Sequence, residues 1–493
     1  MKNFYLALCL LFISQSVLAQ VPGKPEIDTE YRTYSDAIIG LLDPLRANTF
    51  CPGLPSSSVV SGDEDGFNQL SQDLQRVCTS IPNGSSGGTL SGGFAEPFST
   101  RTFLPFTVDS TRPTPPTPSD SPTNSSQAGQ LAFSILPTGN EPGYYSGVFS
   151  GYEYWVAFGL EAVSYRVNSS DFETGRSGAG FRGDFALGRQ FTNGSVLGIG
   201  ISYEKINTDL SQNPFLFEES SASRSPSSIA IALANVENFC RNLVRGEEDF
   251  ETFEAHAFYA GNLSQSTTFQ VFGGVRHTKS DVTSPLCIYQ INDTVGQDSV
   301  FASYLSGSPE VVTASLGARA ERRWVAGNTL LLLRAGAEAQ NRWLDGYTQN
   351  EVPVDASSPP INENGNPISV FNTGLALKYE DRDVFTVTTE LGLRSVWEFG
   401  GPRNPGAYWI DASYQYVFGD TDERVSASFA GDGRAVPTRF TFRGNPIQEH
   451  RITVGTGIDY FISEQLATSL FVSGSFTDLT ESYRVGASLN WQF

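Results

Sequence analysis

Residues 152–493 repeat one pattern, in which apolar residues alternate with small, polar or charged ones. Residues 197–204, for example, read LGIGISYE, so that Leu, Ile, Ile and Tyr share one face of an extended strand. Alternation with a period of two indicates β-strands with one apolar face. No run of about 18 apolar residues follows residue 19, which excludes a membrane protein built from helices. A soluble β protein and a membrane barrel both fit the pattern.

The repeat predicts twelve strands. They are expected near 153–167, 177–191, 195–208, 250–262, 267–280, 309–324, 329–344, 383–398, 407–419, 449–462, 466–477 and 482–493. The segments 371–379 and 423–430 are also strand-like, and we interpret them as hairpin extensions beyond the membrane. Counted as membrane strands, they would raise the number to fourteen.

Short and long connections alternate between these strands. The short ones are 192–194, 263–266, 325–328, 399–406 and 463–465, and the long ones are 209–249, 281–308, 345–382 and 420–448. Barrels of the bacterial outer membrane have tight periplasmic turns and long external loops. We therefore expect an all-β fold, a twelve-stranded antiparallel transmembrane β-barrel whose two ends lie in the periplasm.

The polar face of the predicted strands carries charged residues mixed with glycine, as the lumen of a barrel would. They are Arg182, Asp184, Arg319, Glu321, Arg323, Arg334, Glu338, Arg342, Glu390 and Arg394. These residues could line a channel. A salt-bridged lumen is the favoured interpretation, because a barrel of this size leaves little free space.

The first residues have the pattern of a secretory signal. Lys2 precedes an apolar stretch at residues 5–13, and small residues allow cleavage between Ala19 and Gln20. The chain is accordingly divided into a signal peptide at 1–19, a short N-terminal region at 20–110, a linker with a candidate pore helix at 111–150, and the barrel at 151–493.

The N-terminal region is expected to be small, loop-rich and partly helical. Ser35–Arg46 and Phe67–Cys78 each carry an apolar stripe at helical spacing. Arg112–Pro122 reads RPTPPTPSDSP, which is typical of a linker.

Four cysteines remain once Cys9 is removed with the signal, an even number that suits an oxidising compartment. Cys51 and Cys78 bracket one short interval and are predicted to form a disulfide. Cys240 and Cys287 fall in long loops on the same side of the barrel and could bond there. Two separate free thiols are the alternative for this second pair.

The last predicted strand has a continuous apolar face that ends on an aromatic residue. Its members are Tyr483, Val485, Ala487, Leu489, Trp491 and Phe493. This face resembles the signal that outer-membrane proteins present to the barrel assembly machinery. The resemblance implies that machinery and outer-membrane lipid as partners, in a Gram-negative bacterium, with external loops at the cell surface.

The region 150–493 as a whole resembles the autotransporter β-domain of type V secretion. The resemblance lies in residues 178–191 (GAGFRGDFALGRQF), 196–203 (VLGIGISY), 390–394 (ELGLR) and the closing hairpin 466–493. It implies a barrel that anchors the N-terminal region and displays or exports it at the cell surface. It also implies a helix inside the pore just before the first strand.

The segment that would supply this pore helix departs from the family pattern. Ser126–Leu136 could form three turns, but Pro137 and Pro142 follow it, so a helix that runs on to Tyr152 is not expected. The N-terminal region is also short and lacks the repeats of a β-solenoid.

The sequence shows no catalytic or metal-binding motif, and we expect a non-enzymatic chain without cofactor or metal. A net charge of −21 argues against binding to nucleic acid. His256 and Glu254 are predicted to face the lumen. A phospholipase-like hydrolase would need a His and a Ser on the outer wall, where His277 and Ser306 or Ser308 are the candidates. A channel for small solutes is the favoured alternative, ahead of this hydrolase, and the sequence identifies no surface ligand.

Overall fold

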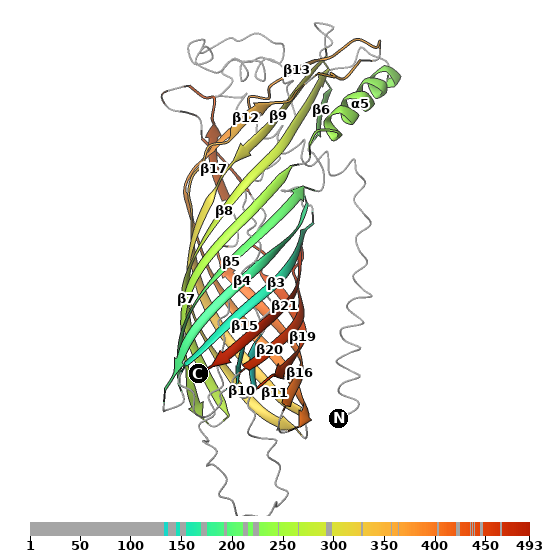
Figure 1. Cartoon of the computed structure of the whole chain (residues 1–493). Helices are drawn as coiled ribbons and strands as arrows, with labels where there is room; N and C mark the ends of the chain where they lie inside the picture. Colours follow the sequence, from blue (N-terminus) through green and yellow to red (C-terminus); the bar gives the residue numbers. More distant parts are fainter. Residues whose placement is uncertain are drawn as a thin grey trace, which may run out of the picture.

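Twelve antiparallel strands close into a barrel in the computed structural model (Figure 1). In order around the barrel they are β3 (Tyr154–Val167), β4 (Arg176–Gln190), β5 (Val196–Leu210), β7 (Glu247–Ser264), β8 (Thr267–Ile291), β10 (Glu310–Ala326), β11 (Thr329–Leu344), β15 (Arg382–Gly401), β16 (Asn404–Gly419), β19 (His450–Phe461), β20 (Leu466–Phe476) and β21 (Thr480–Gln492). β21 pairs with β3 from Thr480 opposite Val167 to Gln492 opposite Trp155, which closes the ring. The predicted fold class, with twelve barrel strands, is confirmed.

The structure describes residues 154–493 apart from gaps in connecting segments. It also describes two short paired strands before the barrel, β1 (Phe133–Leu136) and β2 (Tyr144–Gly147). Only Phe133–Leu136 of the candidate pore helix is described, and it is extended. The predicted signal, the two N-terminal helices, the Cys51–Cys78 bond and the linker lie outside the described residues.

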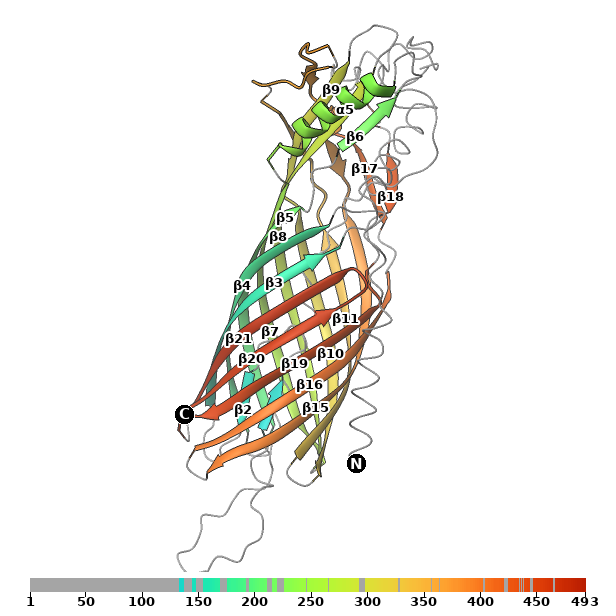
Figure 2. The same ribbon diagram turned by 90° about the vertical axis from the view of Figure 1, so that its right-hand side faces the viewer.

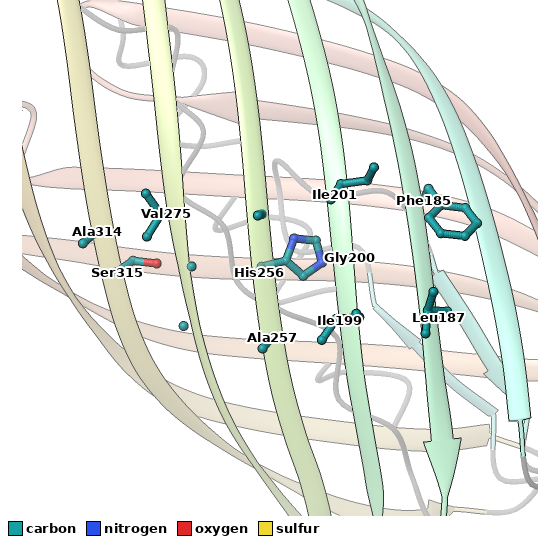
Figure 3. A pocket seen from close by; sticks show the side chains of 13 residues that line it. Phe185, Leu187, Ile199, Gly200, Ile201, His256, Ala257, Val275, Ala314 and Ser315 are labelled. Carbon is teal, nitrogen blue, oxygen red and sulfur yellow. The ribbon is translucent and has the colours of Figure 1, made fainter.

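The exposed face of the barrel strands is the apolar one. On β3, the side chains of Phe158 and Leu160 are 50% and 69% exposed, whereas that of Glu161 is buried. Figure 3 shows further apolar side chains on the neighbouring strands β4 and β5. A soluble barrel would have the opposite arrangement, so this surface is suited to hydrocarbon rather than water. Among the described residues, no helix is both long and apolar enough to cross a membrane.

Aromatic side chains gather on the outside of one end of the barrel. We call this the turn end, because the strand pairs β4–β5, β7–β8, β10–β11, β15–β16 and β19–β20 meet here with only a few residues between the two strands of each pair. Figure 2 shows that the chain also finishes at this end. Three ring pairs mark it: Tyr154 with Phe493, Tyr259 with Phe269, and Trp397 with Tyr408. Girdles of this kind are typical of a membrane–water interface.

The opposite end, which we call the loop end, carries a folded cap. β8 continues past the expected end at Ser280 to Ile291, because its extension pairs with β9 (Ser299–Gly307) and, in parallel, with β6 (Phe215–Glu219). The remaining cap strands are β12 (Asn350–Pro353) and β13 (Ser369–Phe371), both paired with β9, and the separate sheet of β14 (Leu377–Tyr379), β17 (Arg424–Phe429) and β18 (Phe440–Arg443). Segments 371–379 and 423–430 therefore lie outside the barrel, as predicted.

A helix that sequence reasoning missed completes the cap. α5 (Pro226–Arg241) packs its buried residues Ala232, Val236 and Cys240 against the extension of β8. Cys240 is bonded to Cys287, which confirms the second predicted disulfide. The spacing of four between the buried helix residues was the signal that could have revealed this helix.

A glycine in β19 leaves space for the large side chain of a tryptophan in the neighbouring strand β16. Trp409 is fully buried and lies opposite Gly457. A Cβ atom at Gly457 would overlap the Trp409 ring and would lie 2.6 Å from the carbonyl oxygen of Leu470. On the ring, the Arg394 guanidinium carbon lies 4.7 Å from the centroid. The glycine therefore makes room for a stacked Trp–Arg pair.

We predict that Gly457→Ala destabilises the barrel by about 1–3 kcal/mol, because the added methyl group must displace the ring or the strand. Gly183→Ala is the matched control, since the nearest atom to its added carbon is Leu160 Cδ2 at 3.7 Å. The measurement is the urea concentration that unfolds each barrel in detergent. Equal midpoints for the two variants would contradict the prediction.

Candidate functional site

The interior of the barrel has three layers. Near the turn end it is lined by buried aromatic rings, namely those of Trp155, Phe258, Phe272, Trp409 and Phe471. Near the loop end it is lined by mostly aliphatic side chains and one phenylalanine, namely those of Val163, Ile206, Phe250, Val311, Leu344 and Val384. Charged and polar side chains fill the layer between them. This middle layer is the candidate functional site.

All ten charged residues singled out from the sequence lie at positions of the strands that alternate with the exposed face. Eight are buried, from Arg394 at 0% exposure to Glu390 at 6%. Arg323 and Arg342 are half-buried. Successive side chains of a strand point to opposite faces, so every second residue faces the interior. The charged residues occupy these positions together with glycine, serine and threonine.

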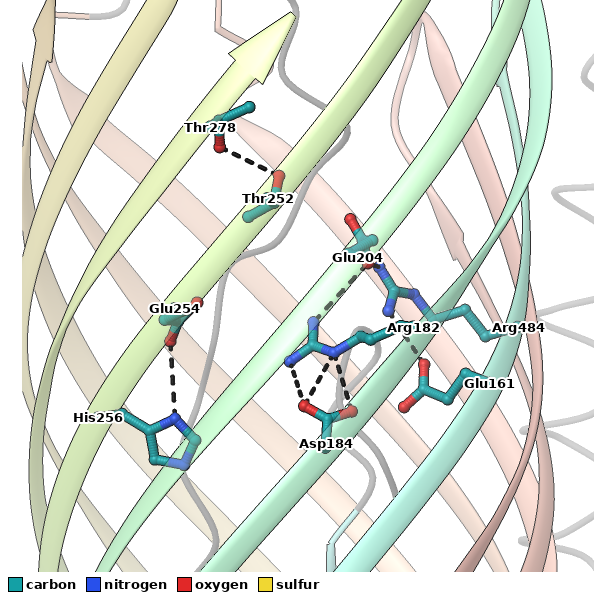
Figure 4. A network of polar contacts seen from close by, with 9 residues as sticks. All are labelled: Glu161, Arg182, Asp184, Glu204, Thr252, Glu254, His256, Thr278 and Arg484. Carbon is teal, nitrogen blue, oxygen red and sulfur yellow. Dashed lines mark hydrogen bonds and ion pairs between the residues drawn. The ribbon is translucent and has the colours of Figure 1, made fainter.

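The first charged cluster connects β21, β3, β4 and β5 across the closing seam (Figure 4). Arg484 is 3.0 Å from a carboxylate oxygen of Glu161 and 3.4 Å from one of Glu204. Arg182 donates to Asp184 at 3.1 Å and lies 3.8 Å from Glu204. Two guanidinium groups are thus held among three carboxylates, and the cluster ties the last strand to the first three.

The second charged cluster connects β10, β11, β15 and β16. Arg334 makes a two-pronged contact with Asp411, at 2.6 and 2.7 Å, and donates to Glu390 at 2.8 Å. Arg319 also donates to Glu390, at 3.0 Å, and Arg394 donates to Asp411 at 3.0 Å. Each carboxylate therefore bridges two arginines, an arrangement that satisfies buried charges well.

The ten lumen charges predicted from the sequence do not include three of the carboxylates in these clusters. Glu161, Glu204 and Asp411 are buried at interior positions of their strands. Strand alternation was the available signal, because each of the three lies an even number of residues from other interior residues of its own strand. Their partners could not be assigned in this way, since Arg484 and Glu161 are 323 residues apart in the chain.

The three histidines lie in different places. His256 is buried in the interior with its Nδ1 4.0 Å from Glu254, as expected. His277 is on the outside of β8, and its Nε2 lies 3.2 Å from Glu310. His450 at the start of β19 has its Nδ1 2.7 Å from the Tyr414 hydroxyl.

The His–Ser pair that a phospholipase-like site would need is not assembled. The Ser308 hydroxyl donates to Asp281 at 2.6 Å, and the Ser306 hydroxyl donates to the carbonyl of Asn350. The His277 ring faces Glu310 instead. Among the described residues, no group of three or more His, Cys, Asp or Glu side chains is placed to hold a metal ion.

The cap packs tightly where it joins the barrel at the loop end. The ring of Tyr347, in the connection after β11, stacks on that of Tyr379 in β14, with centroids 4.5 Å apart. Burial raises the pKa of the Tyr347 hydroxyl, an effect that its hydrogen bond with Tyr379 partly opposes. The Tyr347 hydroxyl is therefore neutral at physiological pH and can remain packed there.

The apolar face of the last strand points outward, toward the membrane side. Tyr483, Val485, Leu489, Trp491 and Phe493 are 40–59% exposed, and Ala487 is exposed as well. Trp491 and Phe493 are in ring contact at 5.2 Å, beside Tyr154. The face is thus displayed on the barrel surface at the turn end.

Comparison with known proteins finds the family that the sequence resembles. Residues 356–473 match the family model of the autotransporter beta-domain, a range that covers β15, β16, β19 and most of β20 within the barrel. The resemblance expected from the sequence is therefore confirmed over this part of the chain. No curated protein matches the chain.

Solved barrels are similar to the chain at low sequence identity. The translocator domain of the autotransporter NalP from Neisseria meningitidis is 8% identical, with a TM-score of 0.45 over 70% of this chain and 90% of that one. The beta domain of the Bordetella autotransporter Brka is 9% identical, with a TM-score of 0.36 over 69% and 99%. The toluene transporter TodX of P. putida is 12% identical, with a TM-score of 0.36 over 69% and 90%.

We predict that Asp411→Asn destabilises the barrel strongly, by about 3–5 kcal/mol, because two buried arginines lose a charged partner. Lys205→Gln is the control, since it removes an exposed ion pair with Glu251 and should have little effect. Unfolding in urea, followed by the loss of the compact form on gels, measures both. A midpoint for Asp411→Asn equal to that of the unchanged barrel would contradict a stabilising role for the second cluster.

Proposed function

We propose that this chain is an outer-membrane barrel of the autotransporter type, which anchors residues 20–150 and displays or exports them at the cell surface. The observation that carries the proposal is the closed twelve-stranded barrel with an apolar exterior, part of which matches the autotransporter beta-domain. The barrel itself contributes no enzyme activity.

The position of the first strand supports this proposal. The backbone of Tyr154 is hydrogen-bonded to that of Phe493 in both directions, so the N-terminal region joins the barrel at the turn end. In outer-membrane barrels the end with short turns faces the periplasm and the end with long loops faces outward. Residues 20–150 would then reach the cell surface only through the lumen.

The outward face of the last strand is proposed as the signal for the barrel assembly machinery. Its aromatic residues Trp491 and Phe493 are exposed at the turn end, where a periplasmic partner would meet them. The cap, with its disulfide between Cys240 and Cys287, would face the medium outside the cell, where disulfides persist.

The central experiment is protease treatment of intact cells that make the full chain. If residues 20–145 are displayed, added protease removes them while the barrel remains. One epitope tag is placed within residues 20–145, and a second one is placed between β10 and β11, on the side of the membrane that is expected to be periplasmic. Complete protection of the first epitope on intact cells, with cleavage after the outer membrane is permeabilised, would refute display.

A channel for small solutes is the second candidate, and the charged middle layer favours it. Single-channel conductance of the purified protein, with and without residues 20–145, separates the two functions. We expect the full chain to conduct poorly, because apolar layers flank the charged clusters. Large and stable conductance of the full chain would instead support the channel.

A hydrolase is the least supported function. Its test is phospholipid hydrolysis by the purified chain and by His277→Ala. We expect no hydrolysis from either, because His277 faces Glu310 and both candidate serines donate hydrogen bonds elsewhere. Hydrolysis that disappears in His277→Ala would overturn this expectation.

A further inference from the structure

The membrane-facing wall has a hollow of about 830 Å³ over strands β4, β5, β7, β8 and β10. One flank is a ridge of bulky side chains, namely those of Phe185, Leu187, Ile199 and Ile201, and the floor is made of Ala255, Ala257, Gly273 and Ala314. Figure 3 shows this ridge on β4 and β5, with the smaller side chains beside it and Val275 beyond. The volume lies in the range of ligand sites, about 300–1,000 Å³.

The register across the strands explains why the wall is hollow here. Ile199 on β5 lies opposite Ala257 on β7, and Ala257 lies opposite Gly273 on β8. Side-chain volume therefore falls from isoleucine to alanine to glycine along one line across the barrel. The next residue in this line is Leu316 on β10, which is 65% exposed and rises again from the surface.

The chemistry of the hollow indicates what can fill it. The outward-facing side chains of its lining are all hydrocarbon, and the two polar ones, His256 and Ser315, belong to positions that face the interior. No side chain of the exterior lining offers a hydrogen bond to water or to a polar ligand. The hollow is also continuous with the exposed apolar surface of the barrel, which in a membrane is in contact with lipid.

We propose that this hollow is a binding site for the acyl chains of an outer-membrane lipid, which stays with the barrel when the bulk lipid is removed. A flexible hydrocarbon chain can lie along the floor and pack against the ridge of Ile199 and Ile201. A flat apolar wall holds lipid only transiently, whereas a walled hollow buries more of each chain. The inference rests on the proposed membrane location of the barrel, but not on display of the N-terminal region.

The test compares two phenylalanine substitutions of exposed alanines. Ala257→Phe fills the floor of the hollow. Ala337→Phe places the same side chain on β11, at an exposed position outside the hollow. The full chain and each variant are extracted from outer membranes in mild detergent, and native mass spectrometry counts the phospholipid and lipopolysaccharide molecules that remain bound.

We expect the unchanged chain and Ala337→Phe to retain lipid, and Ala257→Phe to retain about tenfold less, the effect of excluding roughly two methylene groups. The double variant Ile199→Ala, Ile201→Ala removes the ridge without adding bulk, and it should lose lipid as well. This double variant still tests the proposal if Ala257→Phe does not fold. Folding of each variant is checked by the change of its gel mobility on heating.

Three results would overturn the proposal. The first is an unchanged chain that carries no lipid, and the second is equal lipid retention by all variants. The third is a dimer that only the hollow variants disrupt, which would assign the hollow to a second copy of the chain. Protection of residues 20–145 on intact cells would refute display but leave the lipid result unaffected, so the two proposals fail separately.

Discussion

The pairing of β21 with β3 is the contact on which the rest of the structure depends. In hydrocarbon, every backbone N–H and C=O group needs a partner within the protein, so an open sheet edge is not stable there. Closure pairs the backbone groups of the two edge strands with each other, from Thr480 opposite Val167 to Gln492 opposite Trp155. It also brings the first and last barrel strands side by side, and it forms the first charged cluster, in which Arg484 of the last strand meets Glu161 of the first.

Closure in a membrane inverts the usual distribution of side chains. The side chains of the middle layer are polar or charged, so the hydrophobic effect contributes little to their packing. Buried ion pairs and hydrogen bonds hold this layer together instead. A buried pair stabilises only when its geometry is good, because each charge has lost its contact with water. The bridging carboxylates Glu390 and Asp411 provide that geometry, and the Trp409 ring covers Arg394 where Gly457 leaves room for it. Packing, hydrogen bonding and strand approach therefore depend on one another in this layer.

The two ends of the barrel differ in a way that bears on function. The turn end has short connections, an aromatic girdle and the junction with residues before Tyr154. The loop end has a cap with its own core, made by α5 and the extended β8 and fastened by a disulfide. The junction with the residues before Tyr154 and the folded cap therefore lie at opposite ends of the barrel. The apolar exterior between them is uneven, and its hollow gives the lipid a place to bind.

The sequence by itself determined the local properties of this protein. Alternation in segments such as LGIGISYE set the strands and the two faces of each, and the alternation of short and long connections set the number twelve. Alternation alone could not decide which face is outside, and it was the charged residues mixed with glycine on one face that predicted a lumen there. Nor could it supply the partners of Arg334 and Arg484, the fold of the cap or the hollow beside Ala257. These depend on the register between strands that are distant in the chain, and only the closed tertiary structure fixes that register.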